Sequence, residues 1–460
     1  MRGVFGLETE YGITAAGLSA EEAARELFRP VVAWGRGTSV FTPAGARLYL
    51  DVGSHPEYAT AECSRLAEMV AQERAGDQLM AVLAAAASRR AGVNIALIKN
   101  NTDSAGNAFG CHENYQVPRA GSAELAAKLI PFLVTRQLIA GAGKVQVDPR
   151  GARYVLSQRA LHTSEALSSA TTRSRPMINT RDEPHADGAR YRRLHVIAGD
   201  SNMSAAAAGF KFGATNLLLR AATSGAALPA LELDQPARAI REVAQGWQDA
   251  HPVALADGRL IRPAEVQWEY FEVARQAARD NEDQAVVNLW ERALTAWDRL
   301  DFTGLETELD WLAKWRLIAR YRQRTGAGLA DPRVLRLELA YHQLDAQGGL
   351  RAKLEARGQL ADGIGRKEIA AAVTEPPATT RGRLRGRFIA AARRAGREYT
   401  VDWVRLKLGQ GETVALTDPL DNSDPAALAL IAELEAEPAA GLASELDRLF
   451  AAAGVQADEA

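Results

Sequence analysis

Cysteine is nearly absent from this chain, which has only Cys63 and Cys111 among its 460 residues. A disulfide framework and a zinc centre built from cysteine clusters are therefore excluded. Long apolar runs are absent too, because the longest, Leu79 to Ala87, is far shorter than the roughly 20 residues of a membrane-spanning helix. The N-terminal residues lack the hydrophobic segment of a signal peptide. We expect a soluble, cytoplasmic protein with no membrane partner.

A basic surplus is also missing, because 55 Lys and Arg face 57 Asp and Glu, for a net charge of −2. Non-specific nucleic-acid binding needs such a surplus, so no nucleic-acid partner is expected. Common ligand motifs are incomplete. Ala140 to Lys144 lacks the first glycine of a phosphate loop, Gly409 to Gly411 lacks the third glycine of a dinucleotide fingerprint, and His112 lacks a second zinc-binding histidine four residues on. A nucleotide would have to bind by another route.

Two carboxylates alternate in the first predicted strand, Gly6 to Gly12, at Glu8 and Glu10. Successive side chains of a strand point to opposite faces, so these two share one face. Their mutual repulsion favours a site for a hard metal ion, to which they would supply oxygen ligands. The alternative is the solvated face of an edge strand, which is the favoured interpretation for this pair taken alone.

Two further strand-like segments change that balance. Arg47, Tyr49 and Asp51 alternate in one segment, and Glu57 follows a proline in the next. The planar guanidinium of an arginine suits a phosphate group, and magnesium bound to a nucleotide takes carboxylate, phosphate and water oxygens. Together with the first pair, these residues favour a Mg-ATP site over a solvated edge.

Two other clusters are rich in polar groups. Lys99 to Asp103, with Gly110 to Tyr115 beyond it, could line a pocket or satisfy buried hydrogen bonds, and the residues favour neither. Thr171 to His195 is dense in arginine, histidine and carboxylates. We interpret it as an anion-recognition region, with Arg181 and His195 as candidate site residues, and internal ion pairs are the alternative.

Strand-like and helical segments alternate irregularly over residues 1–220, without the regular repeat of a doubly wound sheet. This pattern predicts an α+β fold. From Pro236 to Ala346 apolar residues recur at helical spacing. Helices are predicted at Ala20–Trp34, Arg65–Arg90, Ser122–Ala140 and Ala214–Ser224, and strands at Asn94–Ile98, Gly143–Val147, Tyr154–Leu156, Met177–Asn179 and His195–Ile197.

Two adjacent prolines, Pro376 and Pro377, divide the last part of the chain from the rest. We predict a large domain over 1–375, a small C-terminal domain over 376–424 and an alanine- and glutamate-rich helical tail over 425–460. The small domain begins with a helix, Arg381–Arg397, followed by a strand at Tyr399–Leu408. The arginines at 381, 383, 385 and 387 fit a solvated helix face better than a binding patch.

Seven blocks of the chain are GLETEYG, GARLYLDVGSHPEYATAEC, KNNTDSAGNAFGCHENY, PFLVTRQLIAGAGKV, SSATTRSRPMINTRDEPHAD, YRRLHVIAGDSNMS and TVDWVRLKL. Together they resemble the Pup–protein ligase family (proteasome accessory factor A), within the carboxylate–amine ligase relatives of glutamine synthetase. The resemblance covers about residues 1–420. It implies a curved antiparallel sheet that forms a cradle for Mg-ATP, backed by helices, in a glutamine synthetase-like catalytic domain with the small domain against one end.

The resemblance also implies an activity. The family uses ATP to phosphorylate the side-chain carboxylate of the C-terminal glutamate of Pup, a small disordered protein modifier. It then joins that carboxylate by an isopeptide bond to a lysine of a target protein, which marks the target for proteasomal degradation. Pup and lysine-bearing proteins would be the partners, and Mg²⁺ and ATP the cofactor and co-substrate.

Site residues follow from the family's motifs. The resemblance makes Glu8, Tyr49 and Glu57 magnesium ligands, Arg47, Thr60 and Trp403 contacts of ATP, Asp51 the catalytic base, and Glu10 a supporting carboxylate. Glu57 and Thr60 would face opposite sides of a straight strand, so the strand must bend after Pro56 if both line the site. Arg181 and His195, in the arginine-rich cluster, would hold the glutamate carboxylates of Pup.

Two rival functions are compatible with much of this pattern. The depupylase and Pup deamidase of the same fold carry a long extra loop between the first acidic strand and the Arg-x-Tyr-x-Asp strand, whereas Gly12 to Gly45 here holds one helix and a short turn. The segment after Asp51 reads Val-Gly-Ser-His, the ligase form. A non-catalytic Pup-binding protein would have lost metal or base residues, and all are present. One departure is Ala205 to Ala208, where the family has a glutamate and threonines.

Overall fold

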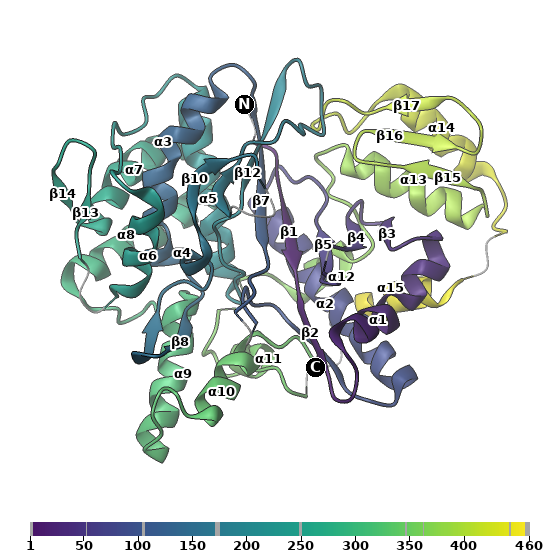
Figure 1. The fold of residues 1–460 in the computed structure, drawn as a ribbon. Coiled ribbons are helices and arrows are strands. Elements are labelled where there is room, and N and C mark those ends of the chain that lie inside the picture. The colour runs from purple at the N-terminus through teal and green to yellow at the C-terminus, as the bar shows by residue number, and fades with distance from the viewer. Residues whose placement is uncertain are drawn as a thin grey trace. The chain divides into compact units, whose positions relative to one another are not determined.

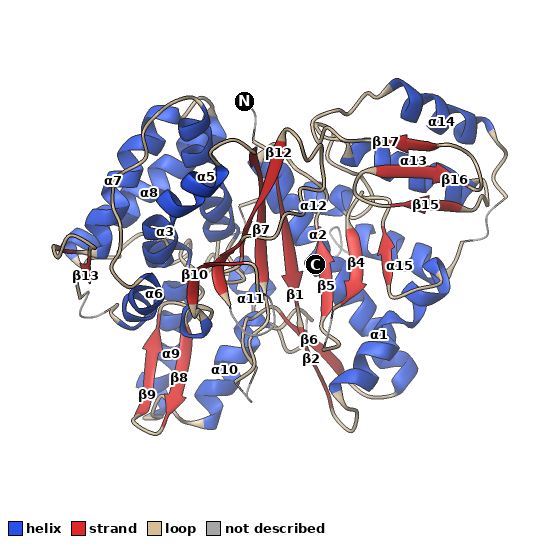
Figure 2. Cartoon of the chain, turned by 45° about the horizontal axis from the view of Figure 1, so that its top comes forward, coloured by secondary structure: helices blue, strands red, loops and turns tan. Residues whose placement is uncertain are grey.

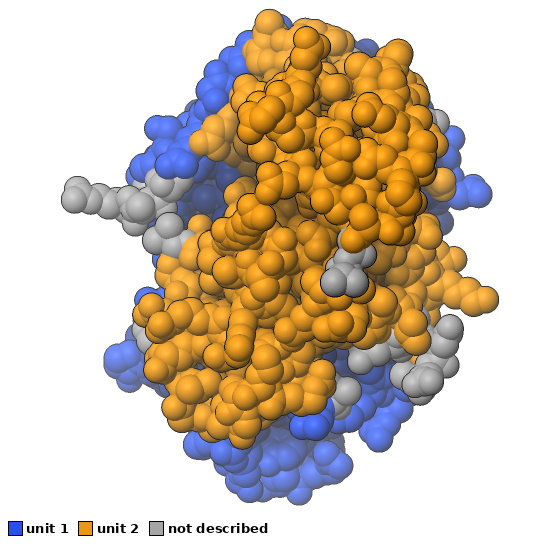
Figure 3. Space-filling model, turned by 90° about the vertical axis from the view of Figure 1, so that its right-hand side faces the viewer, with its two compact units in different colours: residues 1–3, 98–182, 194–363 blue, residues 4–97, 183–193, 364–460 orange. Residues whose placement is uncertain are grey.

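The computed structural model divides the chain into two compact units (Figure 3). Unit 1 comprises Met1–Gly3, Ile98–Asp182 and Leu194–Gly363, and unit 2 comprises Val4–Leu97, Glu183–Arg193 and Ile364–Ala460. Each unit is described here by itself. The structure describes residues 3–51, 53–103, 106–170, 175–247, 251–345, 347–361, 363–440 and 443–455.

Unit 2 contains strands in the order β1-β5-β4-β3, and neighbouring strands are antiparallel (Figure 1). These strands are β1 (Phe5–Glu10), β5 (Pro56–Ala59), β4 (Arg47–Leu50) and β3 (Ser39–Phe41). A short strand, β2 (Gly12–Ala15), pairs with β6 (Ile95–Ile98). Between β1 and β4 the chain forms β2, helix α1 (Ala20–Gly35) and β3, so the one predicted helix is present, together with two short strands that were not predicted.

Helix α2 (Leu66–Ala91) packs against one face of these strands. The ring of Tyr58, from the middle of β5, is buried against Gly76 of α2, where a Cβ would meet it at 2.4 Å. The Thr60 hydroxyl lies 4.0 Å from the Met69 sulfur of the same helix. Because side chains alternate along a strand, Glu57 and Ala59 point to the opposite face. The helix therefore assigns one face of the sheet to packing and leaves the other for the polar residues.

The C-terminal part of unit 2 holds α12 (Arg366–Ala372), α13 (Gly382–Arg394) and a three-stranded sheet, β15-β16-β17. The single strand predicted for Tyr399–Leu408 is wrong, because β15 (Tyr399–Val401) and β16 (Arg405–Leu408) form a hairpin. The Asp402 carboxylate accepts a hydrogen bond from the Val404 N–H at 2.8 Å, which stabilises the turn. β17 is Thr413–Ala415, and the tail forms α14 (Pro425–Ala436) and α15 (Glu445–Val455) on either side of Pro438.

Unit 1 has strands in the order β10-β11-β12-β7 and a larger set of helices (Figure 2). The strands are β7 (Cys111–Pro118), β10 (Glu165–Ser168), β11 (Pro176–Asn179) and β12 (Tyr191–Val196, of which Leu194 onward belongs to this unit), with the hairpins β8 (Lys144–Asp148)–β9 (Gly151–Val155) and β13 (Val253–Ala254)–β14 (Leu260–Ile261). The α-helices are α3 (Ser122–Thr135), α4 (Gln137–Ala140), α5 (Ala205–Thr223), α6 (Pro236–Gln245), α7 (Pro263–Ala277), α8 (Asn281–Arg299), α9 (Asp310–Thr325), α10 (Pro332–His342) and α11 (Arg351–Ala356).

The predicted fold class is confirmed, because antiparallel pairs dominate the sheets and helices back them. Helix α5 begins at Ala205, nine residues earlier than predicted, because Ser204 caps it by accepting the Ala207 N–H. The alanine run that departs from the family pattern is thus the first turn of a helix. Within the described residues, no helix combines the length and apolar character needed to cross a membrane.

The close contact between α2 and β5 predicts the effect of a single methyl group. Replacing Gly76 by Ala would favour the helix by about 1 kcal/mol through propensity. Overpacking the buried Tyr58 ring costs about 1–3 kcal/mol and outweighs that gain. We expect Gly76→Ala to lower the free energy of unfolding, measured by urea denaturation. Gly37→Ala, where a Cβ meets nothing within 4 Å, is the control and should leave stability unchanged; equal effects of both changes would contradict the packing argument.

Candidate active site

Two rows of side chains cross the face of the unit 2 sheet that points away from α2. The first, called the acidic row, consists of Glu10, Glu57 and Tyr49, because Glu10 lies opposite Glu57 and Glu57 lies opposite Tyr49 in the strand register. The second, called the arginine row, consists of Glu8, Ala59, Arg47 and Phe41, which are aligned in the same way. Residues two apart on a strand share a face, so both rows lie on one surface.

The acidic row brings carboxylates close together in a buried place. Glu57 is only 2% exposed, and burial, followed by the charges of Glu8 and Glu10, raises its pKa well above the usual range. The Tyr49 hydroxyl donates a hydrogen bond to Glu57 at 2.5 Å, and burial together with the charge of Glu8 raises the pKa of Tyr49. Like-charged oxygens that converge in this way are stabilised by a cation, and they are the ligand type that magnesium prefers. The donor set therefore fits a hard divalent ion.

Arg47 supplies positive charge beside that cluster. Its guanidinium carbon lies 4.4 Å from the centre of the Tyr49 ring, and its Nε donates to the Ser39 hydroxyl at 2.9 Å. These contacts hold the fork of the guanidinium over the face of the sheet, where it can meet an anion with two parallel hydrogen bonds.

Aromatic side chains close the β3 end of the arginine row. Trp403, in the turn between β15 and β16, packs edge to face on Phe41 with ring centres 4.9 Å apart. The ring of His185 lies 6.2 Å from that of Trp403. Burial and the charge of Arg193 lower the pKa of His185, which favours its neutral form. The β3 end of this face therefore carries aromatic rings, whereas the β1 end carries charged side chains.

Arg193 approaches the opposite end of the arginine row. Its guanidinium lies 3.5 Å from the Glu8 carboxylate and 2.9 Å from that of Glu183. The sequence places it in the arginine-rich cluster without singling it out. The structure places it as a cation beside Glu8.

Asp51 lies at the rim of the same face, directly after β4, and is exposed. Its backbone N–H donates to the His55 carbonyl at 3.0 Å, and Ser54, with a φ of 64°, donates to the Asp51 carbonyl at 3.1 Å. Val52, between them, lies outside the described residues. The Asp51 charge contributes to the raised pKa of Glu57, so the two carboxylates share one electrostatic environment. An exposed carboxylate at the edge of a buried acidic cluster can take a proton from a group that approaches from solvent.

Thr60 follows β5 and turns away from this face. Its hydroxyl accepts the Leu7 N–H at 3.1 Å and lies near the Met69 sulfur on the α2 side. Glu57 and Thr60 therefore have their side chains on opposite sides, as strand alternation requires. The Thr60 N–H is engaged as well, because it donates to the Leu7 carbonyl at 2.9 Å, so a ligand above the acidic row would meet neither the hydroxyl nor the N–H of Thr60.

The other predicted residues belong to unit 1. Arg181 is exposed after β11, and the His195 ring on β12 packs against that of His112 on β7 with centres 5.3 Å apart. Thr171 to Ser174, the start of the arginine-rich cluster, lie outside the described residues. In the cluster after Gly110, the fully buried Glu113 forms an internal pair, because it accepts two hydrogen bonds from Arg136, at 2.6 and 2.8 Å. His112 and Asn114 alternate with it along β7 and lie on its half-buried face.

The prediction that the arginines of α13 form a solvated face is wrong for two of them. Arg381 and Arg385 are 1% and 0% exposed. Arg381 Nε donates to the Glu62 carboxylate at 2.8 Å, and Arg385 donates to the same carboxylate. We call Glu62, Arg381 and Arg385 the buried arginine hub. The signal was present in the sequence, since Leu384 and Phe388 complete with these arginines the i, i+3, i+4, i+7 stripe of a buried helix face.

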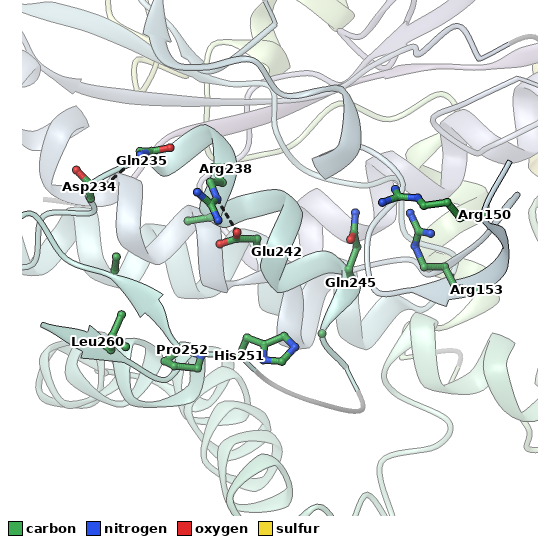
Figure 4. A pocket seen from close by; sticks show the side chains of 13 residues that line it. Arg150, Arg153, Asp234, Gln235, Arg238, Glu242, Gln245, His251, Pro252 and Leu260 are labelled. Carbon is green, nitrogen blue, oxygen red and sulfur yellow. Dashed lines mark hydrogen bonds and ion pairs between the residues drawn. The ribbon is translucent and has the colours of Figure 1, made fainter. Parts of the chain in front are cut away.

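A separate cavity of about 610 Å³ lies in unit 1, beside α6 (Figure 4). Arg238 points to Glu242 at 2.6 Å, and Arg153, at its other side, pairs with Asp148 at 2.9 Å. Arg238 and Arg153 are thus each paired with a neighbouring carboxylate. None of the residues predicted for the active site lines it.

Comparison with known proteins identifies the family of this chain. The model of the Pup-ligase protein family matches residues 3–407, so the chain belongs to that family. The Pup–protein ligase of Xylanimonas cellulosilytica is 50% identical over 445 residues, which cover 92% of this chain and 97% of the relative. That of Nakamurella multipartita is also 50% identical and covers 94% of this chain and 99% of the relative.

Solved structures agree with this assignment. The structure of the Pup ligase PafA in complex with Pup matches with a TM-score of 0.89 at 39% identity, over 94% of this chain and 92% of that one. The structure of PafA in complex with ADP matches with a TM-score of 0.81 at 40% identity, over 93% of this chain and 96% of that one. The predicted resemblance is confirmed.

The buried arginine hub predicts a pH dependence of stability. Despite the cost of burial, the charges of Arg385 and Arg381 lower the pKa of Glu62 from the usual 4.5 to about 2. A depressed pKa in the folded state adds stability that is present above the unfolded value and is lost as the pH falls through the folded one. The contribution of Glu62 should therefore shrink by about 2 kcal/mol between pH 7 and pH 3.

Glu62→Gln tests this expectation by urea denaturation at several pH values. The wild type should exceed the variant in stability by about 3–5 kcal/mol at pH 7, because the variant leaves a buried charge uncompensated. That gap should narrow steadily toward pH 3. Glu412→Gln, at an exposed position, is the control and should show almost no gap at any pH. A gap for Glu62→Gln that does not change with pH would contradict the argument.

Proposed function

We propose that this chain is an ATP-dependent ligase that joins the side-chain carboxylate of the C-terminal glutamate of Pup to lysine side chains of target proteins. The observation that carries the proposal is the sheet face of unit 2, where an acidic row, an arginine and an exposed carboxylate lie together. The Pup–protein ligases among its relatives and the Pup-bound and ADP-bound PafA structures support the same activity. A Pup-bearing target would be directed to proteasomal degradation.

Glu8, Tyr49 and Glu57 are the proposed magnesium ligands, with Glu10 as a supporting carboxylate. The buried, mutually repelling carboxylates give the physical reason, because their charge requires a compensating cation once Glu57 is ionised. A magnesium ion bound there would offset phosphate charge and hold the γ-phosphoryl group in line for transfer. Tyr49, whose hydroxyl is held by Glu57, is the neutral oxygen of the set.

Arg47, Thr60 and Trp403 are the proposed contacts of ATP. Arg47 is suited to the phosphates, since its guanidinium lies over the ring of Tyr49, a member of the acidic row. Trp403 offers an aromatic face at the far end of the arginine row, where the base of the nucleotide would stack. Thr60 would act through its backbone carbonyl, because Leu7 engages both its hydroxyl and its N–H.

The reaction needs two steps, because a carboxylate is a poor electrophile. The γ-phosphoryl group of ATP first passes to the glutamate side chain of Pup, which yields an acyl phosphate and ADP. Arg47 offsets the negative charge that moves during this transfer. A lysine amine then attacks the carbonyl carbon of the acyl phosphate. The bond from that carbon to the phosphate oxygen breaks, and phosphate leaves as the amide forms.

Asp51 is the proposed catalytic base of the second step. A free lysine has a pKa of about 10.4 and is mostly protonated at neutral pH. An exposed carboxylate at the rim can accept the proton as the amine attacks. We propose Arg181 and His195 for the carboxylates of Pup, because both carry groups that can donate hydrogen bonds to anions.

The depupylase remains the second candidate on chemical grounds, since the same site could activate water instead of an amine. The short connection between β1 and β4, which consists of β2, α1 and β3, favours the ligase over it. A non-catalytic Pup-binding protein is disfavoured by the complete set of acidic and basic groups on the sheet face. We also propose a catalytic domain over residues 1–375, a small C-terminal domain over 376–424 and a helical tail over 425–460. The proposed location of the protein is the cytoplasm.

The activity is tested by incubating the chain with Pup ending in glutamate, Mg-ATP and a lysine-bearing target. We expect a Pup-sized mass increase of the target, detected by mass spectrometry, with one ADP released for each conjugate. Asp51→Asn should lower the rate by about 100-fold or more, because the base is lost while ADP binding remains. Release of Pup from a preformed conjugate, without any new conjugation, would instead establish the depupylase.

The acidic row predicts a second result. Glu57→Gln should lower ligation by about 100-fold at a fixed magnesium concentration, because one ligand loses its charge. Its thermal stability without metal should not fall, because Gln removes a charge that burial and the neighbouring carboxylates disfavour. Added EDTA should stop the wild-type reaction. Glu21→Gln, on the exposed face of α1, serves as the control and should keep full activity; full activity of Glu57→Gln would refute the proposed metal role.

A further inference from the structure

We propose that the buried arginine hub positions Trp403 and His185 for the base of a purine nucleotide, so that Glu62, Arg381 and Arg385 are positioning residues of the ATP site. This inference deepens the proposed function and rests on it. It assigns a role to three charged residues that lie under the aromatic end of the arginine row. All of them belong to unit 2.

Arg385 contacts Trp403 in two different ways. Its Nη1 donates to the Trp403 carbonyl at 3.1 Å, and its guanidinium carbon lies 4.8 Å from the centre of the indole. Its Nε donates to the Gly45 carbonyl at 2.9 Å, two residues before Arg47. One fully buried guanidinium therefore fixes both the backbone and the ring of Trp403 relative to the start of β4.

Phe41 links this guanidinium to the arginine row. The ring of Phe41 lies 5.4 Å from the Arg385 guanidinium carbon and 6.0 Å from that of Arg47. Trp403 stands nearly perpendicular to the same ring, at 85°. A shift of the Arg385 guanidinium would therefore move the rings of Phe41 and Trp403, which border the β3 end of the face, where the nucleotide base is proposed to bind.

Arg381 holds the other ring-bearing segment. Its Nη2 donates to the His185 carbonyl at 2.5 Å, and its Nη1 donates to the Leu416 carbonyl at 2.7 Å. His185 has a φ of 47°, in the left-handed region that non-glycine residues seldom adopt. A hydrogen bond from a charged donor to its carbonyl stabilises that conformation. The same bond fixes the backbone from which the His185 ring, 6.2 Å from that of Trp403, projects.

Glu62 orients both arginines. It accepts hydrogen bonds from Arg381 and Arg385, and the Thr380 hydroxyl donates to its backbone carbonyl at 2.6 Å. Glu62 lies two residues after Thr60, so the hub is attached to the end of β5. Buried ion pairs add little net stability compared with apolar packing, but their hydrogen bonds are directional. Directional bonds to carbonyls and rings of the site match a positioning role better than a purely stabilising one.

Arg385→Lys tests this role, because it keeps the charge but loses the fork and the flat surface that contacts Trp403. We expect the Kd for ADP, measured by calorimetry without Pup, to rise about tenfold, and the KM for ATP in ligation to rise equally. The kcat at saturating ATP and the KM for Pup should stay within about twofold. Arg387→Lys, on the same helix and paired with Glu435 at 2.9 Å, is the matched control and should change neither constant.

A double-mutant cycle shows whether Arg385 acts through Trp403. In a Trp403→Ala background, Arg385→Lys should add almost nothing to the weakening of ADP binding. Additive effects, or an unchanged ADP affinity of folded Arg385→Lys, would overturn the proposal and leave the hub a purely structural feature. If Arg385→Lys does not fold, Arg381→Lys replaces it, since it loses the fork that donates to the His185 and Leu416 carbonyls. An unchanged ADP affinity of that variant would overturn the proposal as well.

The two proposals fail in different experiments. ADP binding is measured without Pup, so a wild type that binds ADP but forms no conjugate would refute the proposed function and leave the hub intact. A wild type that forms conjugates, with ADP affinity unaffected by the hub, would refute only the hub.

Discussion

The antiparallel register of β1, β5 and β4 is the constraint on which the proposed site depends. It aligns Glu10 with Glu57 and Glu57 with Tyr49, so that groups from three strands meet in one row. A shift of one residue in any of these strands would turn its side chain toward α2. The packing of Tyr58 on Gly76 opposes such a shift, because it requires the even-numbered residues of β5 to face the helix. The hydrophobic side of the sheet thereby determines the chemistry of its other side.

Two carboxylates of unit 2 have opposite electrostatic surroundings. Glu62 is surrounded by two guanidinium groups, and its pKa is lowered. Glu57, five residues earlier, is surrounded by other carboxylates, and its pKa is raised. In the first arrangement the protein itself supplies the compensating charge, which suits a group that holds other residues in place. In the second arrangement the carboxylates lack a compensating charge from one another, which suits a site where a cation and phosphate groups bind.

Much of this could be predicted from the sequence, because the relevant signals are local. Alternation placed Glu8 with Glu10 and Arg47 with Tyr49, and the structure has each pair on one face. The helices near residues 20–34 and 65–90 were predicted closely, since their apolar pattern and their ends are encoded within a few residues. The hairpin at Asp402 was missed because a turn made by one side-chain hydrogen bond leaves little trace in hydrophobicity. The burial of Arg381 and Arg385 was missed because a charged residue in a helix usually faces solvent.

Residue identity and short-range spacing are enough to specify the family, the fold class and the set of residues that point to Mg-ATP chemistry. Which of these residues meet depends on the three-dimensional fold. It set Glu57 between Glu10 and Tyr49, turned the Thr60 hydroxyl to the helix side, and brought Glu62 to two arginines more than 300 residues away along the chain. Pairings over such distances depend on how strands register and how helices pack, and no local pattern of the chain specifies them.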